Sequence, residues 1–262
     1  MSRIISIHSF RGGTGKSNIS ANLAALLAME GRRVGVVDTD IQCPGLHVLF
    51  GLDEDQMKLT LNEYLRGECK IEDVAYPAGN GANADHAPGR RRLSGQNIWV
   101  IPSSINAGEI SAILRNGYDV NRLNEGLQMV RKNLALDYLL IDTHPGLNDE
   151  TLLSIAFSDV LIVVLRLDQQ DFQGTAVTVD VARSLDVPQL LLMVNQVLTR
   201  YDFQQVRDQV AQTYGAPVAA VLPLTEDLVD LQSSDLFALR WPQHPWSIAI
   251  RQVANELLHG DG

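Results

Sequence analysis

The feature that most constrains the fold of this chain is a glycine-rich turn between a short apolar run and a helical pattern. Residues 4–7 read Ile-Ile-Ser-Ile and predict a strand, residues 9–17 read Ser-Phe-Arg-Gly-Gly-Thr-Gly-Lys-Ser, and residues 18–30 carry apolar side chains at helical spacing. In this order, the unpaired N–H groups of the helix N-terminus and the positive end of the helix dipole face the turn. The order therefore predicts an anion-binding cradle within an α/β fold.

Further apolar runs have the length of buried strands, at residues 34–37, 98–101, 138–141, 160–164, 190–194 and 218–221. Most of them are nearly continuous in apolar residues, which is the pattern of parallel strands covered on both faces. Amphipathic helical stretches lie between them, as at residues 120–134 and 203–214. We therefore expect a single domain over residues 1–262, with a doubly wound, mostly parallel sheet and helices on both faces.

The composition is that of an ordinary soluble globular protein, with 45% hydrophobic and 20% charged residues. The formal net charge of -10 disfavours a uniformly basic nucleic-acid surface, although it leaves room for a local patch. Cys43 and Cys69 form no C-x-x-C pair, so they give no sign of a metal or iron–sulfur site and fit a reducing compartment. The sequence has neither a signal-peptide pattern nor an apolar run of about 18 residues, so we expect a cytoplasmic protein.

One segment, residues 77–97, departs from the strand–helix alternation. It is rich in glycine and proline and contains the run Arg90-Arg91-Arg92. This composition predicts a flexible, basic insertion on the surface. Two interpretations remain open: a solvated loop, or a docking site for an acidic partner, nucleic acid or an anionic surface.

The glycine-rich turn has the residues that a phosphate site requires. Glycines let the backbone wrap closely around a β-phosphate. Lys16 places a positive charge on the β- and γ-phosphates, and the Ser17 hydroxyl can bind Mg²⁺. The predicted phosphate-binding residues are Gly12, Gly13, Thr14, Gly15, Lys16 and Ser17.

The turn does not follow the ordinary Walker A pattern, because Phe10 stands where that pattern has its first glycine. Residues 11–17, Arg-Gly-Gly-Thr-Gly-Lys-Ser, resemble the deviant Walker A box of the MinD/ParA family, Lys-Gly-Gly-x-Gly-Lys-Ser/Thr. Residues 36–40 are similar to that family's second motif, and residues 140–146 to its Walker B segment. Further likeness at residues 61–67, 71–73 and 101–104 is nearer to MinD than to plasmid ParA proteins. The resemblance implies a P-loop ATPase with ATP and Mg²⁺ as cofactors, which forms a homodimer when ATP is bound.

The resemblance also assigns roles to polar residues at strand ends. It implies that Asp38 orients the attacking water and that the Mg²⁺ site is formed by Ser17, Asp142 and Asp38. The role of Asp40 is left open, and a carboxylate after a strand can instead cap the next helix. Asn195 is the residue that would read the adenine edge, and Pro223 would flank the base. A turn-forming asparagine is the alternative for the first of these.

Two positions depart from the family pattern. Arg11 replaces the family's first lysine, which reaches the partner's nucleotide across the dimer. Arginine is a planar fork and lysine a compact charge, so Arg11 is either an arginine finger acting in trans or a surface residue. The last helical stretch, residues 246–258, carries one arginine and no lysine, unlike the lysine-rich tail of MinD. We expect its apolar stripe to pack on the core and not to bind membranes.

The expected catalytic residues are therefore Lys16, Asp38 and Arg11, in a slow ATPase that an unknown protein partner stimulates. The favoured function is a dimerising switch for intracellular positioning or partitioning. Two alternatives stay open: an ATPase that regulates or assembles a secretion, polysaccharide or surface apparatus, and a nucleotide-binding scaffold that does not hydrolyse ATP. His144 is given no role.

Overall fold

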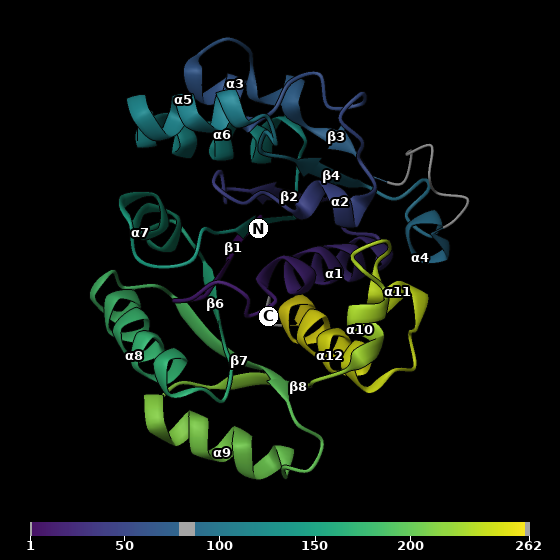
Figure 1. Cartoon of the computed structure of the whole chain (residues 1–262), viewed down its shortest axis with the longest axis vertical. Coiled ribbons are helices and arrows are strands. Elements are labelled where there is room, and N and C mark those ends of the chain that lie inside the picture. Colours follow the sequence, from purple (N-terminus) through teal and green to yellow (C-terminus); the bar gives the residue numbers. More distant parts are fainter. Residues whose placement is uncertain (1, 79–86, 260–262) are drawn as a thin grey trace.

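The computed structural model describes residues 2–78 and 87–259. Its centre is an eight-stranded sheet in the order β3-β4-β2-β5-β1-β6-β7-β8, in which every neighbouring pair is parallel except β3–β4 (Figure 1). The strands are β1 (Arg3–His8), β2 (Val34–Asp38), β3 (Tyr76–Pro77), β4 (Ile98–Ile101), β5 (Tyr138–Asp142), β6 (Val160–Leu165), β7 (Gln189–Val197) and β8 (Val218–Pro223). The expected doubly wound, mostly parallel sheet is confirmed.

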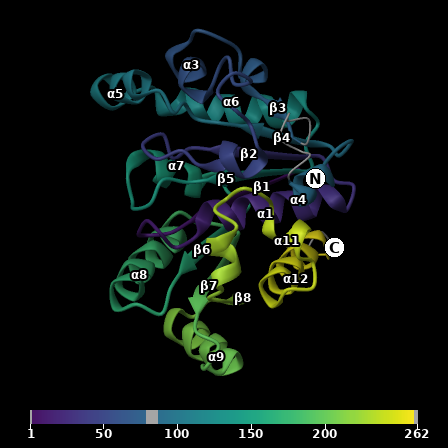
Figure 2. The same cartoon turned by 45° about the vertical axis from the view of Figure 1, so that its right-hand side comes forward.

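Helices cover both faces of this sheet (Figures 1 and 2). One face is covered mainly by the first and last long helices, and the other by two groups, one over β2, β4 and β5 and one over β6, β7 and β8. The helices are α1 (Lys16–Met29), α2 (Leu46–Phe50), α3 (Leu61–Arg66), the 3-10 helix η1 (Ile71–Val74), α4 (Pro88–Arg91), α5 (Ala107–Asn116), α6 (Val120–Asn133), α7 (Asp149–Ala156), α8 (Gln169–Ser184), α9 (Phe203–Tyr214), α10 (Glu226–Asp230), α11 (Phe237–Arg240) and α12 (Pro245–His259).

The parallel order brings the carboxyl ends of the central strands to one edge of the sheet. Ile7 of β1 and Asp38 of β2 are both in register with Asp142 of β5, and all three residues are buried. Ligands of open α/β sheets bind at this edge. The topology therefore gathers the motifs that follow β1, β2 and β5 in one place.

The insertion expected at residues 77–97 contains an ordered basic turn in its described part. Residues 79–86 lie outside the described part of the chain, but α4 forms directly after them. Arg90 is buried in this helix, donates to the carbonyl oxygen of Ser234 and lies 4.0 Å from a carboxylate oxygen of Asp235. Asp235 also accepts the backbone N–H groups of Gly89 and Arg90. The expectation of a flexible loop is wrong for this basic turn, because a buried carboxylate distant in sequence anchors it.

The last helix packs as the sequence predicts. Trp246, Ile250, Val253 and Leu257 of α12 are buried in the core that also contains α1. The apolar stripe of the tail is thus a core-packing face. Over the described residues, no helix has the length and apolar character needed to cross a membrane.

Candidate functional site

The glycine-rich turn forms a tight loop between β1 and α1. Gly13 and Gly15 have φ angles of +77° and +89°, in the left-handed region that favours glycine. A Cβ atom on Gly15 would lie 2.5 Å from the side-chain nitrogen of Asn195. The loop is fastened to the end of β7, because Asn195 Nδ2 donates to the carbonyl oxygen of Thr14 at 2.8 Å. Gln196, which the sequence gave no reason to choose, donates to the Gly13 oxygen at 3.2 Å.

Lys16 begins α1 and is only 7% exposed. Burial lowers the pKa of its ammonium group, while Asp142, Asp40 and Asp38 oppose that shift because their negative charges favour the protonated amine. A buried lysine at the start of a helix, with the free N–H groups of the first turn beside it, is a binding site for a polyanion. The position agrees with the phosphate-binding role expected for Lys16.

Asp142 at the end of β5 has the character of a cation ligand. Its carboxylate is 1% exposed and accepts a hydrogen bond from the Ser20 hydroxyl at 2.9 Å. Burial raises the pKa of Asp142 to about 6, and the nearby Ser17 hydroxyl and Lys16 act in the opposite direction. Its second oxygen, Oδ2, is buried without a hydrogen-bond partner among the described residues. An orphaned carboxylate oxygen beside a serine hydroxyl fits Mg²⁺, which prefers oxygen ligands.

The two carboxylates after β2 differ in their surroundings. Asp38 is fully buried, and its oxygens accept backbone N–H groups from Asp40 at 3.1 Å, Gly45 at 2.8 Å and Leu46 at 3.0 Å. Burial, with Asp142 next in importance, raises its pKa to about 8. The side chain of Asp40 is 15% exposed and lies 3.8 Å from His144 Nε2. Asp38 therefore holds the loop that leads into α2, whereas Asp40 is partly exposed and its charge acts on that of Lys16.

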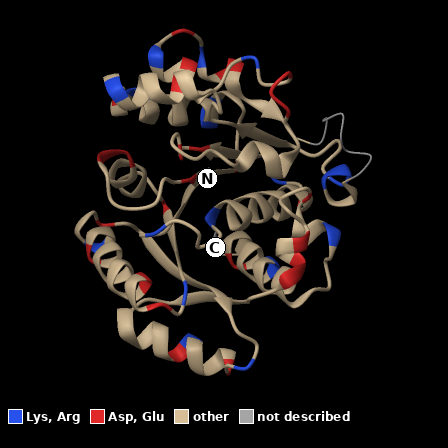
Figure 3. Cartoon of the chain, in the orientation of Figure 1, with Lys and Arg blue, Asp and Glu red and all other residues tan. Residues whose placement is uncertain are grey.

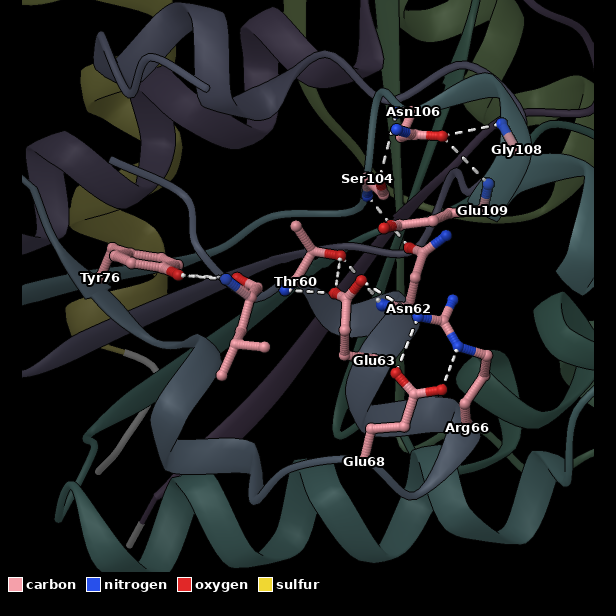
Figure 4. Close-up of polar contacts among 11 residues, drawn as sticks. Thr60, Asn62, Glu63, Arg66, Glu68, Tyr76, Ser104, Asn106, Gly108 and Glu109 are labelled. Atoms are coloured by element: carbon pink, nitrogen blue, oxygen red, sulfur yellow. Dashed lines mark hydrogen bonds and ion pairs between the residues drawn. The ribbon is translucent and has the colours of Figure 1, made fainter. Parts of the chain in front are cut away.

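A polar network behind β2 fixes the position of this loop. The Ser103 hydroxyl, just after β4, donates to the backbone oxygen of Asp38 at 2.7 Å. The next residue, Ser104, is held through its N–H by the Asn62 side chain at 3.0 Å. Figure 4 shows this contact beside the capping box of α3, in which Thr60 and Glu63 bond to each other. The segments at residues 61–67 and 101–104 thus support the candidate site from behind.

A small cavity adjoins the phosphate loop where a nucleotide base would lie. It measures about 180 Å³ and is lined by Gly15, Asn195, Pro223, Leu224 and Leu228, among others. The structure therefore brings Asn195 and Pro223 to one cavity at the loop, as expected. One N–H of the Asn195 amide is engaged with Thr14, which leaves its second N–H and its oxygen for a base.

The two residues that open the loop both contact α8. Arg11 Nη1 lies 3.4 Å from Asp168 Oδ1 and 3.9 Å from Asp171 Oδ1, and its side chain is 42% exposed. Phe10 lies against Gly174, where an added Cβ would be 2.1 Å from the Phe10 ring. Exposed ion pairs contribute about 0–1 kcal/mol, so Arg11 can be released at little cost.

Sequence reasoning missed the residues under the loop. His8 is buried at the end of β1, where its Nδ1 lies 2.8 Å from the Thr143 hydroxyl, and that hydroxyl donates to the Ile7 oxygen at 3.0 Å. Burial, then Lys16, lowers the pKa of His8 to about 3, which keeps the ring neutral beneath the loop. A polar residue in an apolar strand next to a phosphate loop was the available signal.

These features, a glycine loop between strand and helix with a buried lysine and a strand-end carboxylate, define a P-loop nucleotide-binding protein. Comparison with known proteins agrees. The AAA domain family matches residues 2–187. The chain is 30% identical over 230 residues to the chromosome partitioning protein ParA of Caulobacter vibrioides, covering 84% of this chain and 80% of ParA. The chain therefore belongs to the MinD/ParA family of P-loop ATPases.

Two further proteins are similar over nearly the whole chain. An uncharacterized ATP-binding protein of Methanocaldococcus jannaschii is 28% identical over 262 residues, which are 98% of this chain and 88% of that protein. Among solved structures, the septum site-determining protein MinD of Pyrococcus horikoshii in complex with Mg-ADP has a TM-score of 0.81 and 23% identity, covering 100% of this chain and 98% of MinD. The second likeness supports the fold alone.

Proposed function

We propose that this protein is a slow ATPase that dimerises around Mg-ATP and acts as a switch in intracellular positioning or partitioning. The observation that carries the proposal is the buried Lys16 at the start of α1 together with the buried Asp142, whose charge acts on that of Lys16 and whose Oδ2 has no hydrogen-bond partner among the described residues. Lys16 and the free N–H groups of the loop would bind the phosphates of ATP. Ser17 and Asp142 would hold Mg²⁺, which neutralises phosphate charge when bound.

We assign the orientation of the attacking water to Asp40 in preference to Asp38. Both oxygens of Asp38 accept backbone N–H groups, so this carboxylate serves the loop after β2. The side chain of Asp40 is partly exposed, and its Oδ1 accepts the Cys43 N–H at 3.1 Å. This replaces the role that the family resemblance gave to Asp38, and it leaves Asp38 to set where Asp40 lies.

Arg11 would act across the dimer. In the single chain it rests mainly on the exposed Asp168, a contact that costs little to break, and lies 3.9 Å from the buried Asp171. An ATP tetra-anion between two acidic chains needs more positive charge than one Lys16 and one Mg²⁺ supply. Arginine can bind phosphate oxygens with two parallel hydrogen bonds, which makes Arg11 suited to this task. Dimerisation would then be favoured only while ATP is bound.

Light scattering with a slowly hydrolysed ATP analogue, and with ADP as control, tests the switch. We expect the wild-type mass to double with the analogue and not with ADP. Arg11→Ala should bind the analogue as a monomer and fail to dimerise, whereas Arg11→Lys should dimerise again. Asp168→Asn is a matched control, since it removes the charge of the nearer of the two resting partners of Arg11 and leaves the arginine. A wild-type chain that stays monomeric, or an Arg11→Ala chain that dimerises normally, would refute the switch.

The functional alternatives make different predictions. A nucleotide-binding scaffold would show no turnover with Mg-ATP under any condition. A switch in positioning would be stimulated by its cargo, such as DNA, and an ATPase of a surface or secretion apparatus by a component of that apparatus. The cytoplasm is the compartment that the proposal requires, because ATP is available there.

A further inference from the structure

A groove that the nucleotide site does not use runs along the open side of β8. Over the described chain, β8 is one of the two outermost strands of the sheet and pairs only with β7. The groove has a volume of about 370 Å³. Its lining includes Phe203 and Arg207 from α9, Val221 from β8, and Ile248 and Gln252 from α12. We call this feature the β8 groove.

The two helices that line the groove belong to opposite faces of the sheet. Helix α9 packs into the core that contains Val218 and Val221 of β8, and α12 packs into the core that contains Ala220 and Leu222. Figure 1 shows β8 between these two helices at the border of the molecule. A groove lined by both helices must therefore cross the edge of β8.

The edge of β8 is weakly protected. An outermost strand presents backbone N–H and C=O groups without partners, and native proteins usually guard such edges with charged side chains or a covering element. Arg207 donates to the Val218 oxygen and, at 3.3 Å, to the Ala219 oxygen, which covers the start of the strand. The six residues of β8, Val-Ala-Ala-Val-Leu-Pro, carry no charge, and the strand is tan along its length in Figure 3.

The side chains around the groove set the chemistry of what could fill it. Ile248 is 42% exposed on one wall, and Phe203 stands on the other. Arg207 is the charged residue of the lining, which contains no carboxylate among the residues that the structure places there. In a chain with a net charge of -10, this is an apolar groove with a cationic end. It complements an apolar strand that carries an acidic residue.

We propose that the β8 groove binds an extended segment of another protein, which adds a strand to the edge of β8. Backbone hydrogen bonds to β8 would give affinity, and alternate apolar side chains of the segment would lie between Phe203 and Ile248. An acidic side chain of the segment would pair with Arg207. This inference goes beyond the proposed ATPase switch and does not depend on it. The two sites are neighbours, because Pro223 lines both the β8 groove and the base cavity.

Fluorescence polarisation with labelled heptapeptides tests the proposal on the full chain. Every peptide has valine at alternate positions. The peptides differ in which of the remaining positions carries a charged residue, and each of these positions is tested once with glutamate and once with lysine. We expect a glutamate peptide to bind with a Kd below about 1 mM and at least about tenfold more tightly than its lysine counterpart. Methylation of the backbone amide nitrogens on the side of the glutamate peptide that faces β8 should remove binding, because the added strand then has no N–H donors for β8.

A matched pair of surface variants localises the peptide. Ile248→Lys should weaken binding at least about tenfold, whereas Val177→Lys, at an equally exposed apolar position of α8, should not change it. Both variants should bind ATP like wild type. The proposal is wrong if no peptide in the panel binds below about 1 mM, or if binding ignores amide methylation or the Ile248 change. A dimer of the wild-type chain that forms without ATP, and that the Ile248→Lys change dissociates, would also contradict the proposal. In that case a second copy of the chain would occupy the edge of β8.

Discussion

The carboxyl edge of the central strands and the lateral edge of β8 belong to one sheet but present opposite chemistry. At the first edge, Lys16, Asp38 and Asp142 are all buried. Burial lowers the pKa of Lys16 and raises the pKa values of Asp38 and Asp142, so it favours the neutral form of each group. At the second, an uncharged strand offers its backbone between two helices. The first edge can recognise a ligand through fixed charges, and the second through main-chain hydrogen bonds. The difference explains why side-chain motifs reveal only the first.

The largest effect should come from replacing, one at a time, the two carboxylates that follow β2. Asp40→Asn should reduce turnover about 10²-fold, the low end of the contribution of a positioned carboxylate, with ATP affinity nearly unchanged. Asp38→Asn should instead loosen the loop held at Gly45 and Leu46, and lower the free energy of unfolding by about 1–3 kcal/mol at pH 4, where the raised pKa of Asp38 does not yet reduce the stability of the wild-type protein. Single-turnover kinetics and urea unfolding of both variants measure this. If Asp38→Asn alone stops hydrolysis while the chain stays as stable as wild type, the two roles are reversed.

The buried carboxylates also predict how stability depends on pH. The folded pKa values of Asp38, about 8, and Asp142, about 6, lie above the ordinary value of 3.8. These two carboxyls bind more protons in the folded than in the unfolded state, and they outweigh His8, whose lowered pKa of about 3 acts in the opposite direction below its ordinary value of 6.5. The stability of the nucleotide-free, Mg²⁺-free protein should therefore fall as pH rises from 4 to 8. Asp142→Asn should flatten this slope and add at most about 3 kcal/mol at neutral pH. Urea unfolding at several pH values measures how the free energy of unfolding changes with pH. A free energy of unfolding that rises from pH 4 to pH 8 would contradict this prediction.

A smaller effect is expected at the base cavity. Asn195→Ala removes the hydrogen bond to Thr14 and the amide group that lines the cavity, so ATP should bind about tenfold more weakly. Gln196→Ala is the comparison, because it removes the other bond to the loop, at Gly13, and leaves the Asn195 amide in place, although Gln196 also lines the cavity. Equal losses in the two variants would mean that both residues serve the loop and that neither reads the base.

Much of the fold was predictable, because buried parallel strands leave continuous apolar runs in the sequence. Apolar runs with both faces covered, as at residues 4–7, 98–101 and 138–141, became strands that differ from the prediction by at most one residue at each end. The antiparallel β3 was missed, because Tyr76–Pro77 is too short to leave a pattern. Local sequence cannot show a pairing of two residues that depends on β4.

The residues of the candidate site were easier to find than their orientation. Lys16 lies at the start of α1 and Asn195 contacts the loop, and the roles that the motifs give them stay predictions. The sequence could not distinguish Asp38 from Asp40, since both follow β2 and only the loop at residues 45–46 decides which one is enclosed. Nor could it predict that Arg11 rests on Asp168, because that contact joins positions 157 residues apart. Such tertiary contacts carry no local signal.

The central claim is that the carboxyl edge binds Mg-ATP through Lys16, and calorimetric titration tests it most directly. Wild-type protein should bind ATP, with higher affinity when Mg²⁺ is present, since Asp142 has a free oxygen for the ion. Lys16→Ala should lose binding by at least about a hundredfold, because a charge-assisted contact to phosphate and its buried position are both lost. Lys132→Ala, an exposed lysine of α6, serves as the control and should bind like wild type. Unchanged ATP affinity in a folded Lys16→Ala protein would contradict the account.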